Sequence, residues 1–251
     1  MTKFQFDNPG KFIPSALVVI GAVIEFFRTP DQFYGYLFFS LAAVLAVGLL
    51  SAARLRKHSK KRSDLSWVIM PVLFAAGLFG TMAATNTLGM LFAVLAVYIL
   101  YFYFSYFPSG IPQYIEQTFV LLGTFMLVVA VWSLNFFFSP PWWLVTLLFF
   151  GVSFLIFWQM FYKMGQMEKN LTLGALIGGL IMAEVSWALL FWPVYFFTAA
   201  LVSFSLFYVC YILSGLYFEG RLTSRKVYFQ LALVLLVLFA TLASTAWEIM
   251  L

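Results

Sequence analysis

The sequence has few charged residues, one cysteine and one histidine. Charged side chains make up 9% of it, whereas about 25% is usual in soluble domains. The single cysteine, Cys210, excludes an internal disulfide and a cysteine-based metal cluster. The single histidine, His58, lies in a basic segment, where we expect a solvated side chain. We therefore expect no metal site, because such sites draw on several ligands.

The sequence also lacks the motifs of most enzyme classes. It has no Walker loop and no dinucleotide-binding fingerprint. No apolar run carries a nucleophile beside a histidine or lysine base, so intramembrane hydrolysis has no candidate residues. An enzyme is therefore the least favoured class, and we expect neither a catalytic residue nor a cofactor.

Hydrophobic residues make up 64% of the chain, more than a soluble fold of this size could bury. A bilayer would cover such surface. A spanning helix needs about 20 mostly apolar residues, and continuous rather than alternating apolar runs favour helices over strands. We therefore predict an all-α transmembrane bundle of nine spans, at residues 12–29, 33–53, 67–85, 87–107, 117–138, 142–162, 171–191, 194–217 and 228–250.

Basic residues are concentrated in a few of the predicted connections. With nine spans, every basic residue except Arg28 falls on one side of the membrane, which the positive-inside rule identifies as the cytoplasm. The N-terminus is then cytoplasmic, and the net charge of +5 needs no nucleic acid to explain it. The first apolar run, residues 12–27, lacks a small-residue cleavage site after it, so we expect it to be retained as a span.

We expect one transmembrane domain over residues 1–251, in which two hairpins, 117–163 and 171–217, resemble each other weakly. Aligning Pro141 with Pro193 also brings hydroxyl residues of the two hairpins into register. One interpretation is an internal repeat of the kind that some transporters use. The other is that proline turns and interfacial aromatics recur in any bundle, and the small number of matching positions favours it.

Glu184 lies well inside a predicted span, and the surrounding stretch 174–192 has no basic residue. A charged side chain there is costly unless it is protonated, paired or in a polar cavity, so it is a functional candidate. The alternative is a protonated acid that only holds helices together. The other polar groups that could build a solute, ion or lipid site near Glu184 are Glu25, Asn135 and Gln159. The amides of Asn135 and Gln159, however, belong to a type that more often forms hydrogen bonds between helices.

Three further features concern packing and partners. Gly174 and Gly178 have the small-residue spacing that allows close helix contact, either within the chain or against another copy or another membrane protein. A basic segment could bind anionic lipid headgroups, although a determinant of topology is the simpler interpretation. Aromatic residues make up 21% of the chain, and we expect them to face lipid rather than to line a cavity. The basic segment that could bind lipid headgroups contains Arg54, Arg56, Lys57, Lys60, Lys61 and Arg62.

The C-terminal third contains a more specific pattern. Glu184 and Trp187 are followed by Phe191-Trp192-Pro193, then by Tyr208, and later by Glu219-Gly220-Arg221-Leu222-Thr223. Over residues 173–247 this pattern resembles an uncharacterised family of multi-pass membrane proteins from reduced-genome, candidate-phylum bacteria. Trp192 stands where that pattern has a leucine. The resemblance implies a bacterial inner membrane, adds Trp187 to the candidate site residues and implies no activity.

Two classes of function therefore remain. The first is transport or binding of a small solute, ion or lipid at a polar site near Glu184. The second is a non-catalytic subunit or scaffold of a larger membrane complex. The absence of soluble domains and the scarcity of polar residues in the spans favour a subunit or scaffold. The isolated acid Glu184 favours transport or binding.

Overall fold

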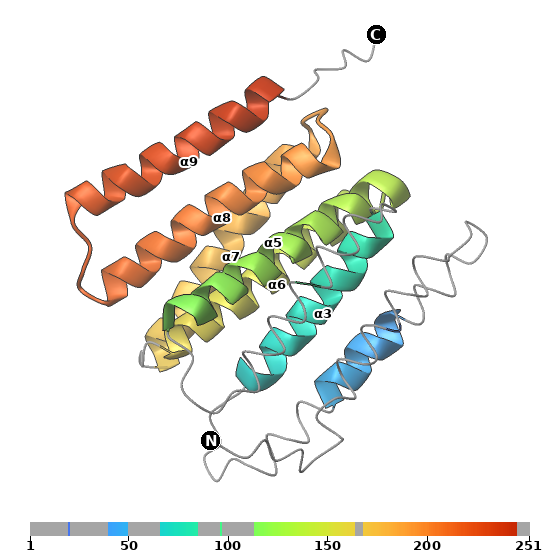
Figure 1. The fold of residues 1–251 in the computed structure, drawn as a ribbon, viewed down its shortest axis with the longest axis horizontal. Helices are drawn as coiled ribbons and strands as arrows, with labels where there is room; N and C mark the ends of the chain where they lie inside the picture. Colours follow the sequence, from blue (N-terminus) through green and yellow to red (C-terminus); the bar gives the residue numbers. More distant parts are fainter. Residues whose placement is uncertain are drawn as a thin grey trace. The chain divides into compact units, whose positions relative to one another are not determined.

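The computed structural model describes residues 20, 40–49, 66–84, 96, 113–163 and 168–244. Every regular element in these ranges is helical (Figure 1). Five of the helices are long and apolar enough to cross a membrane. The chain is therefore an all-α protein with the character of a helical membrane bundle, as the sequence predicts.

The described helices coincide with six of the predicted spans. They are α3 (Ser66–Ala84), α5 (Gln113–Phe138), α6 (Trp142–Lys163), α7 (Glu168–Leu190), α8 (Phe196–Phe218) and α9 (Ser224–Ser244). A shorter apolar helix, Ser40–Leu49, lies inside the predicted span 33–53. The predicted spans 12–29 and 87–107 lie outside the described residues, apart from two isolated helical positions.

Proline residues separate two pairs of helices where the sequence predicts breaks. The segment Ser139-Pro140-Pro141 separates α5 from α6, and Pro193 lies between α7 and α8. Proline has no N–H with which to continue a helix and restricts the residue before it. Ser139 is left-handed, with φ 45°, and its N–H donates to the carbonyl of Asn135, which closes the last turn of α5.

The chain divides into two compact units, Met1–Gly123 and Thr124–Leu251. In the first unit, α3 packs closely where glycine leaves room. A Cβ at Gly123 would lie 2.7 Å from the ring of Phe74, and one at Gly48 would lie 3.2 Å from Val72. Such distances allow the helices of this unit to approach one another more closely than larger residues would permit.

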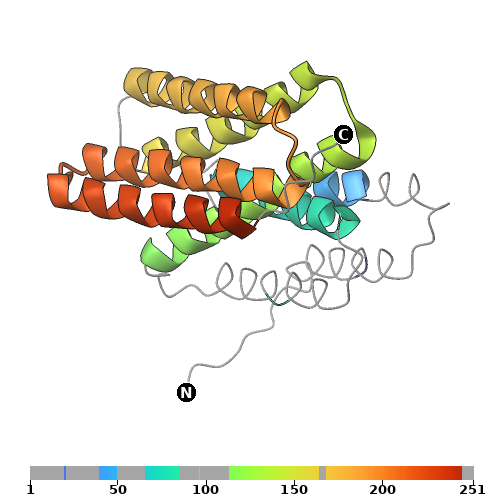
Figure 2. The same ribbon diagram turned by 90° about the horizontal axis from the view of Figure 1, so that it is seen from above.

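In the second unit, α6 and α7 form an antiparallel pair with extensive contact (Figure 2). Gly174 and Gly178 face this contact: a Cβ at Gly174 would lie 2.8 Å from the ring of Phe161, and one at Gly178 would lie 2.6 Å from the ring of Phe157. The close contact predicted from the glycine spacing is thus made within the chain.

Aromatic side chains fill the interior of the second unit. Phe157 lies 5.2 Å from Phe207 of α8, and Phe161 lies 4.8 Å from Phe218, between ring centroids. Phe157, Phe161 and Phe207 are all buried. The expectation that the aromatic residues face lipid is therefore wrong for these rings, because tight helix packing leaves flat ring-sized spaces that they fill.

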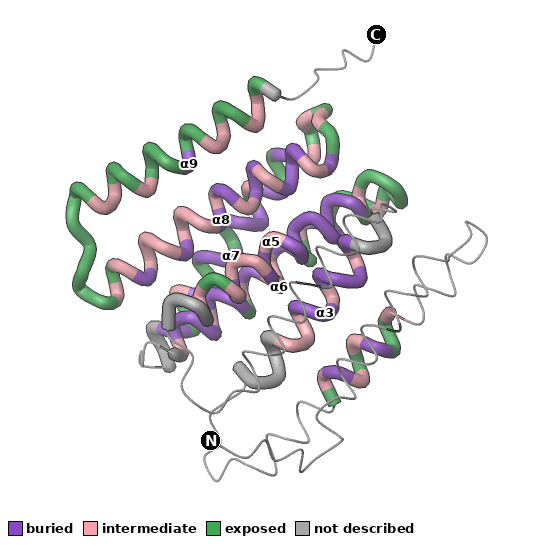
Figure 3. Tube along the Cα trace, viewed as in Figure 1, coloured by how far each residue is buried: buried purple, intermediate pink, exposed green. Residues whose placement is uncertain are grey.

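The last helix, α9, lies beside α8 (Figures 1 and 2). The Tyr208 hydroxyl of α8 donates a hydrogen bond to Oε1 of Gln230 in α9, at 3.0 Å. Val234 is the one fully buried residue among 224–243. Most of α9 thus remains exposed apolar surface (Figure 3).

Candidate functional site

The outer face of α7 carries an exposed acid within an apolar stripe. The stripe repeats every three or four residues, so its side chains lie on one side of the helix. We call these residues the α7 stripe: Leu173, Leu176, Ile177, Leu180, Ile181, Glu184 and Trp187, all exposed. The opposite face, with Ala175, Met182 and Ser186, is buried.

Glu184 is placed deep within its span for a charged residue. It lies in the candidate span Leu171–Leu190, about 9 Å from the C-terminal end at the usual helical rise. It is the only charged residue of that span. In the part of the chain that the structure describes, it makes no ion pair or hydrogen bond. An ionised carboxylate that faces hydrocarbon is costly, so a basic partner at this depth would stabilise Glu184.

Trp187 lies one turn beyond Glu184 on the same exposed face. Its ring contacts Phe191 edge-on, with 5.3 Å between the ring centroids. Both rings are exposed, and they lie at the end of the span, where aromatic side chains collect at the membrane interface. The pair lies at the C-terminal end of the α7 stripe, and Glu184 lies one turn further into the span.

The two amides of the predicted site lie at opposite ends of the second unit. Asn135 is in the last turn of α5 and is half-buried, whereas Gln159 is near the other end of α6. Because α5 and α6 are joined by a short turn, the helical rise separates them by about 20 Å along the helix axes. Glu184 projects from the outer face of α7. These three residues therefore do not come together in one site.

Among the described residues, Gln159 is the one side chain whose polar atoms are fully buried and have no hydrogen-bond partner. It is 2% exposed, and neither its Oε1 nor its Nε2 has a hydrogen-bond partner there. Its face of α6 also carries Phe149 and Ile156, which are buried. A buried amide without partners costs free energy, so Gln159 is a place where a polar group would be stabilised.

Sequence reasoning missed a polar link in the interior. The Trp132 indole Nε1 of α5 donates to Oγ of Ser203 in α8 at 2.9 Å, and that hydroxyl donates to the carbonyl of Ala199. Trp132 and Ser203 are buried, and the indole also lies 5.6 Å from the ring of Phe149 in α6. The position of Trp132 inside a span could have indicated this interior hydrogen bond, because tryptophan is usually enriched at membrane interfaces.

Comparison with protein families gives a match over most of the chain. The profile of a family described as Protein of unknown function (DUF5656) matches residues 15–245. The chain belongs to this family. The resemblance to an uncharacterised family therefore extends well beyond residues 173–247, where the sequence pattern placed it. No curated protein and no solved structure matches the chain.

Several site predictions for this DUF5656 protein fall outside the described residues. They are Glu25 and the basic segment Arg54, Arg56, Lys57, Lys60, Lys61 and Arg62. Among the residues that the structure describes, no three or more histidine, cysteine, aspartate or glutamate side chains lie close enough together to hold a metal ion. Of the predicted site residues within the described ranges, Glu184 and Trp187 are the two that share a surface.

Proposed function

We propose that this DUF5656 protein is a non-catalytic subunit of a membrane complex, and that the α7 stripe docks a spanning helix of another protein. One observation carries the proposal: Glu184 is exposed within an apolar face inside a span. Charge complementarity defines the partner as a helix with a lysine or arginine at the depth of Glu184. Such a pair would neutralise a carboxylate that lipid cannot solvate.

The pattern of the stripe supports a helical partner. Exposed apolar residues at every third or fourth position offer a ridge that a second helix can pack against. Glu184 would then contribute specificity, because a partner without a basic group would leave its charge unpaired. The glycine face cannot serve this partner, since Gly174 and Gly178 already lie against α6.

Site-specific crosslinking tests the proposal. A photo-crosslinking residue at Leu180, one turn before Glu184, should capture one membrane protein in native membranes, and the crosslinked peptide should carry a basic residue inside an apolar run. The same residue at Leu147, an exposed position of α6, is the control and should not capture it. Glu184→Leu should abolish the capture, whereas Glu184→Asp should retain it.

Three outcomes would overturn the proposal. These are absence of a crosslinked product from Leu180, an equal product from Leu147, and a product of twice the mass of this chain. The last would identify a second copy as the occupant. The native mass of the gently extracted protein gives an independent answer, because a subunit should be recovered in a defined complex with another protein.

Transport or solute binding is the second candidate, and Gln159 is the observation that favours it. An interior amide with both polar atoms free suits a neutral solute that can donate and accept hydrogen bonds. Proteoliposomes tested for swelling in glycerol or urea would report such passage. Loss of uptake in Gln159→Met with unchanged uptake in Glu184→Gln would locate this function in the interior.

We further propose the nine-span topology, with the N-terminus in the cytoplasm of a bacterium and the protein in its inner membrane. The asymmetry of basic residues supports this orientation. A Cys210→Ser background allows a test by labelling of single cysteines from each side. Ser59→Cys should react only from the cytoplasm and Ser139→Cys only from outside, and the reverse pattern would refute the orientation.

A further inference from the structure

Backbone hydrogen bonds define the geometry of the turn between α8 and α9. Gly220 is left-handed, with φ 65°, and the Arg221 N–H donates to the carbonyl of Leu216 while the Gly220 N–H donates to that of Tyr217. This is the Schellman arrangement, which uses a glycine to end a helix and satisfy its last carbonyls. The backbone that carries Arg221 is thus fixed relative to α8.

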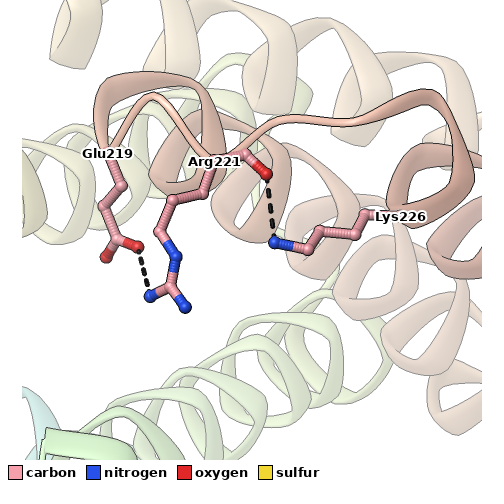
Figure 4. Close-up of polar contacts among 3 residues, drawn as sticks. All are labelled: Glu219, Arg221 and Lys226. Carbon is pink, nitrogen blue, oxygen red and sulfur yellow. Dashed lines mark hydrogen bonds and ion pairs between the residues drawn. The ribbon is translucent and has the colours of Figure 1, made fainter.

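Three basic residues lie in and directly after this turn, and we call Arg221, Arg225 and Lys226 the basic turn. The Lys226 Nζ donates to the backbone carbonyl of Arg221 at 3.1 Å, and the Arg221 Nη1 lies 3.5 Å from Oε2 of Glu219 (Figure 4). Glu219 is the only acid in 219–226, so the turn keeps a positive excess.

The basic turn retains donors for an anion. Arg221 is 70% exposed, and its guanidinium has five N–H groups, of which one faces Glu219. The ammonium of Lys226 has three, of which one is used within the turn. Arg225 is exposed. Each of these groups can donate a hydrogen bond to a phosphate oxygen, and charged hydrogen bonds of this kind are stronger than neutral ones.

The position of the turn adds a second requirement for the ligand. It joins two candidate spans, Phe196–Phe218 and Ser224–Ala243, so it lies where a bilayer has its headgroups. Tyr217, Tyr228 and Phe229 flank it and are exposed, as aromatic residues at a membrane interface are. At this position, the anion expected to meet the turn is the headgroup of a lipid.

Apolar surface continues from the turn along α9. Leu235, Leu236 and Phe239 are exposed further into the span, and Phe239 is 75% exposed. Such a surface accepts acyl chains, whereas a free phosphate would gain nothing from it. Three cationic residues at the interface suit the phosphate of a phospholipid, and the exposed apolar side chains of α9 suit its acyl chains.

We propose that the basic turn binds the phosphate of an anionic phospholipid whose acyl chains lie along α9. The site is separate from the α7 stripe. The proposal requires only that α8 and α9 span the membrane, so it stands or falls independently of the docked subunit.

Lipid binding to the purified full-length protein in detergent tests the site. Native mass spectrometry would follow titration with phosphatidylglycerol or phosphatidylcholine of identical acyl chains, and phosphatidylglycerol should bind at least about tenfold more tightly. The double variant Arg225→Gln/Lys226→Gln should bind phosphatidylglycerol about 30-fold less tightly. The control Lys163→Gln/Lys169→Gln loses the same charge elsewhere and should stay within about threefold of the wild type.

Glu219→Gln provides a test in the opposite direction. It removes the carboxylate beside Arg221 and should raise the affinity for phosphatidylglycerol, a gain that damage to the fold would not produce. If the two double variants lose the same affinity for phosphatidylglycerol, binding depends on the overall charge of the protein and the proposed site is wrong. Displacement of the lipid by millimolar inorganic phosphate would overturn the assignment to a phospholipid.

Discussion

Replacing Gln159 with methionine is expected to stabilise the purified protein. The side chain is 2% exposed and neither polar atom has a partner among the described residues, so folding removes its hydration without compensation. Methionine has a similar length and shape and carries no polar atom that needs a partner. Removing an unsatisfied buried group in this way should raise the free energy of unfolding by about 1–3 kcal/mol.

The expected change is large enough to measure. For a chain of this size, each kcal/mol shifts the midpoint of thermal unfolding by about 2–4 °C. The monodisperse fraction that survives heating in detergent would report the midpoint. Gln230→Met is the matched control, because the amide of Gln230 accepts a hydrogen bond from Tyr208 and the same substitution there should lower the midpoint.

A lower midpoint for Gln159→Met would refute this reasoning. It would mean that the amide already has a partner in the purified protein, either a bound polar molecule or a part of the chain outside the described residues. Mass spectrometry of the wild type and the variant under native conditions would separate these two explanations, because only a bound molecule changes the mass.

Further predictions concern helix contacts in the second unit. Gly178→Ala should destabilise the protein by about 1–3 kcal/mol relative to Gly151→Ala, because a Cβ at Gly178 meets a ring at 2.6 Å whereas one at Gly151 meets nothing within 4 Å. Ser203→Ala should lower the free energy of unfolding by about 1–3 kcal/mol, since it leaves the buried indole N–H of Trp132 without an acceptor. The hydroxyl of Ser186 bonds only within its own helix, so Ser186→Ala should lower the free energy of unfolding by less. Equal decreases in thermal midpoint for the two variants would contradict a stabilising role of the Trp132–Ser203 hydrogen bond.

The helices could be predicted from sequence because local signals determine them. The span predicted at 142–162 agrees with α6, which begins at Trp142, directly after two prolines. The start of α9 was predicted at residue 228, but the helix begins at Ser224. Apolar content locates the membrane-embedded part of a helix, whereas backbone hydrogen bonds continue through Arg225 and Lys226 into the polar interface.

The direction in which each helix face points could not be predicted. Glu184 and Gly178 lie on the same helix, and nothing in the sequence decides which of them faces α6. The close approach of Phe157 to Gly178 decides it, because the helix face without side chains must meet the bulky partner. Glu184 is then turned outward. Such a choice depends on contacts between residues far apart in the sequence, and a single sequence does not show which of them pair.

The sparse contacts of α9 have a consequence for biosynthesis. With Val234 as the one buried residue among 224–243, protein packing contributes little to holding this helix in place. Its insertion must then depend on its own apolar length and on the cations that precede it, as in the first stage of a two-stage assembly. We therefore expect α9 to insert independently of its contacts with α8, so that two fragments divided at Gly220 should assemble when they are co-expressed.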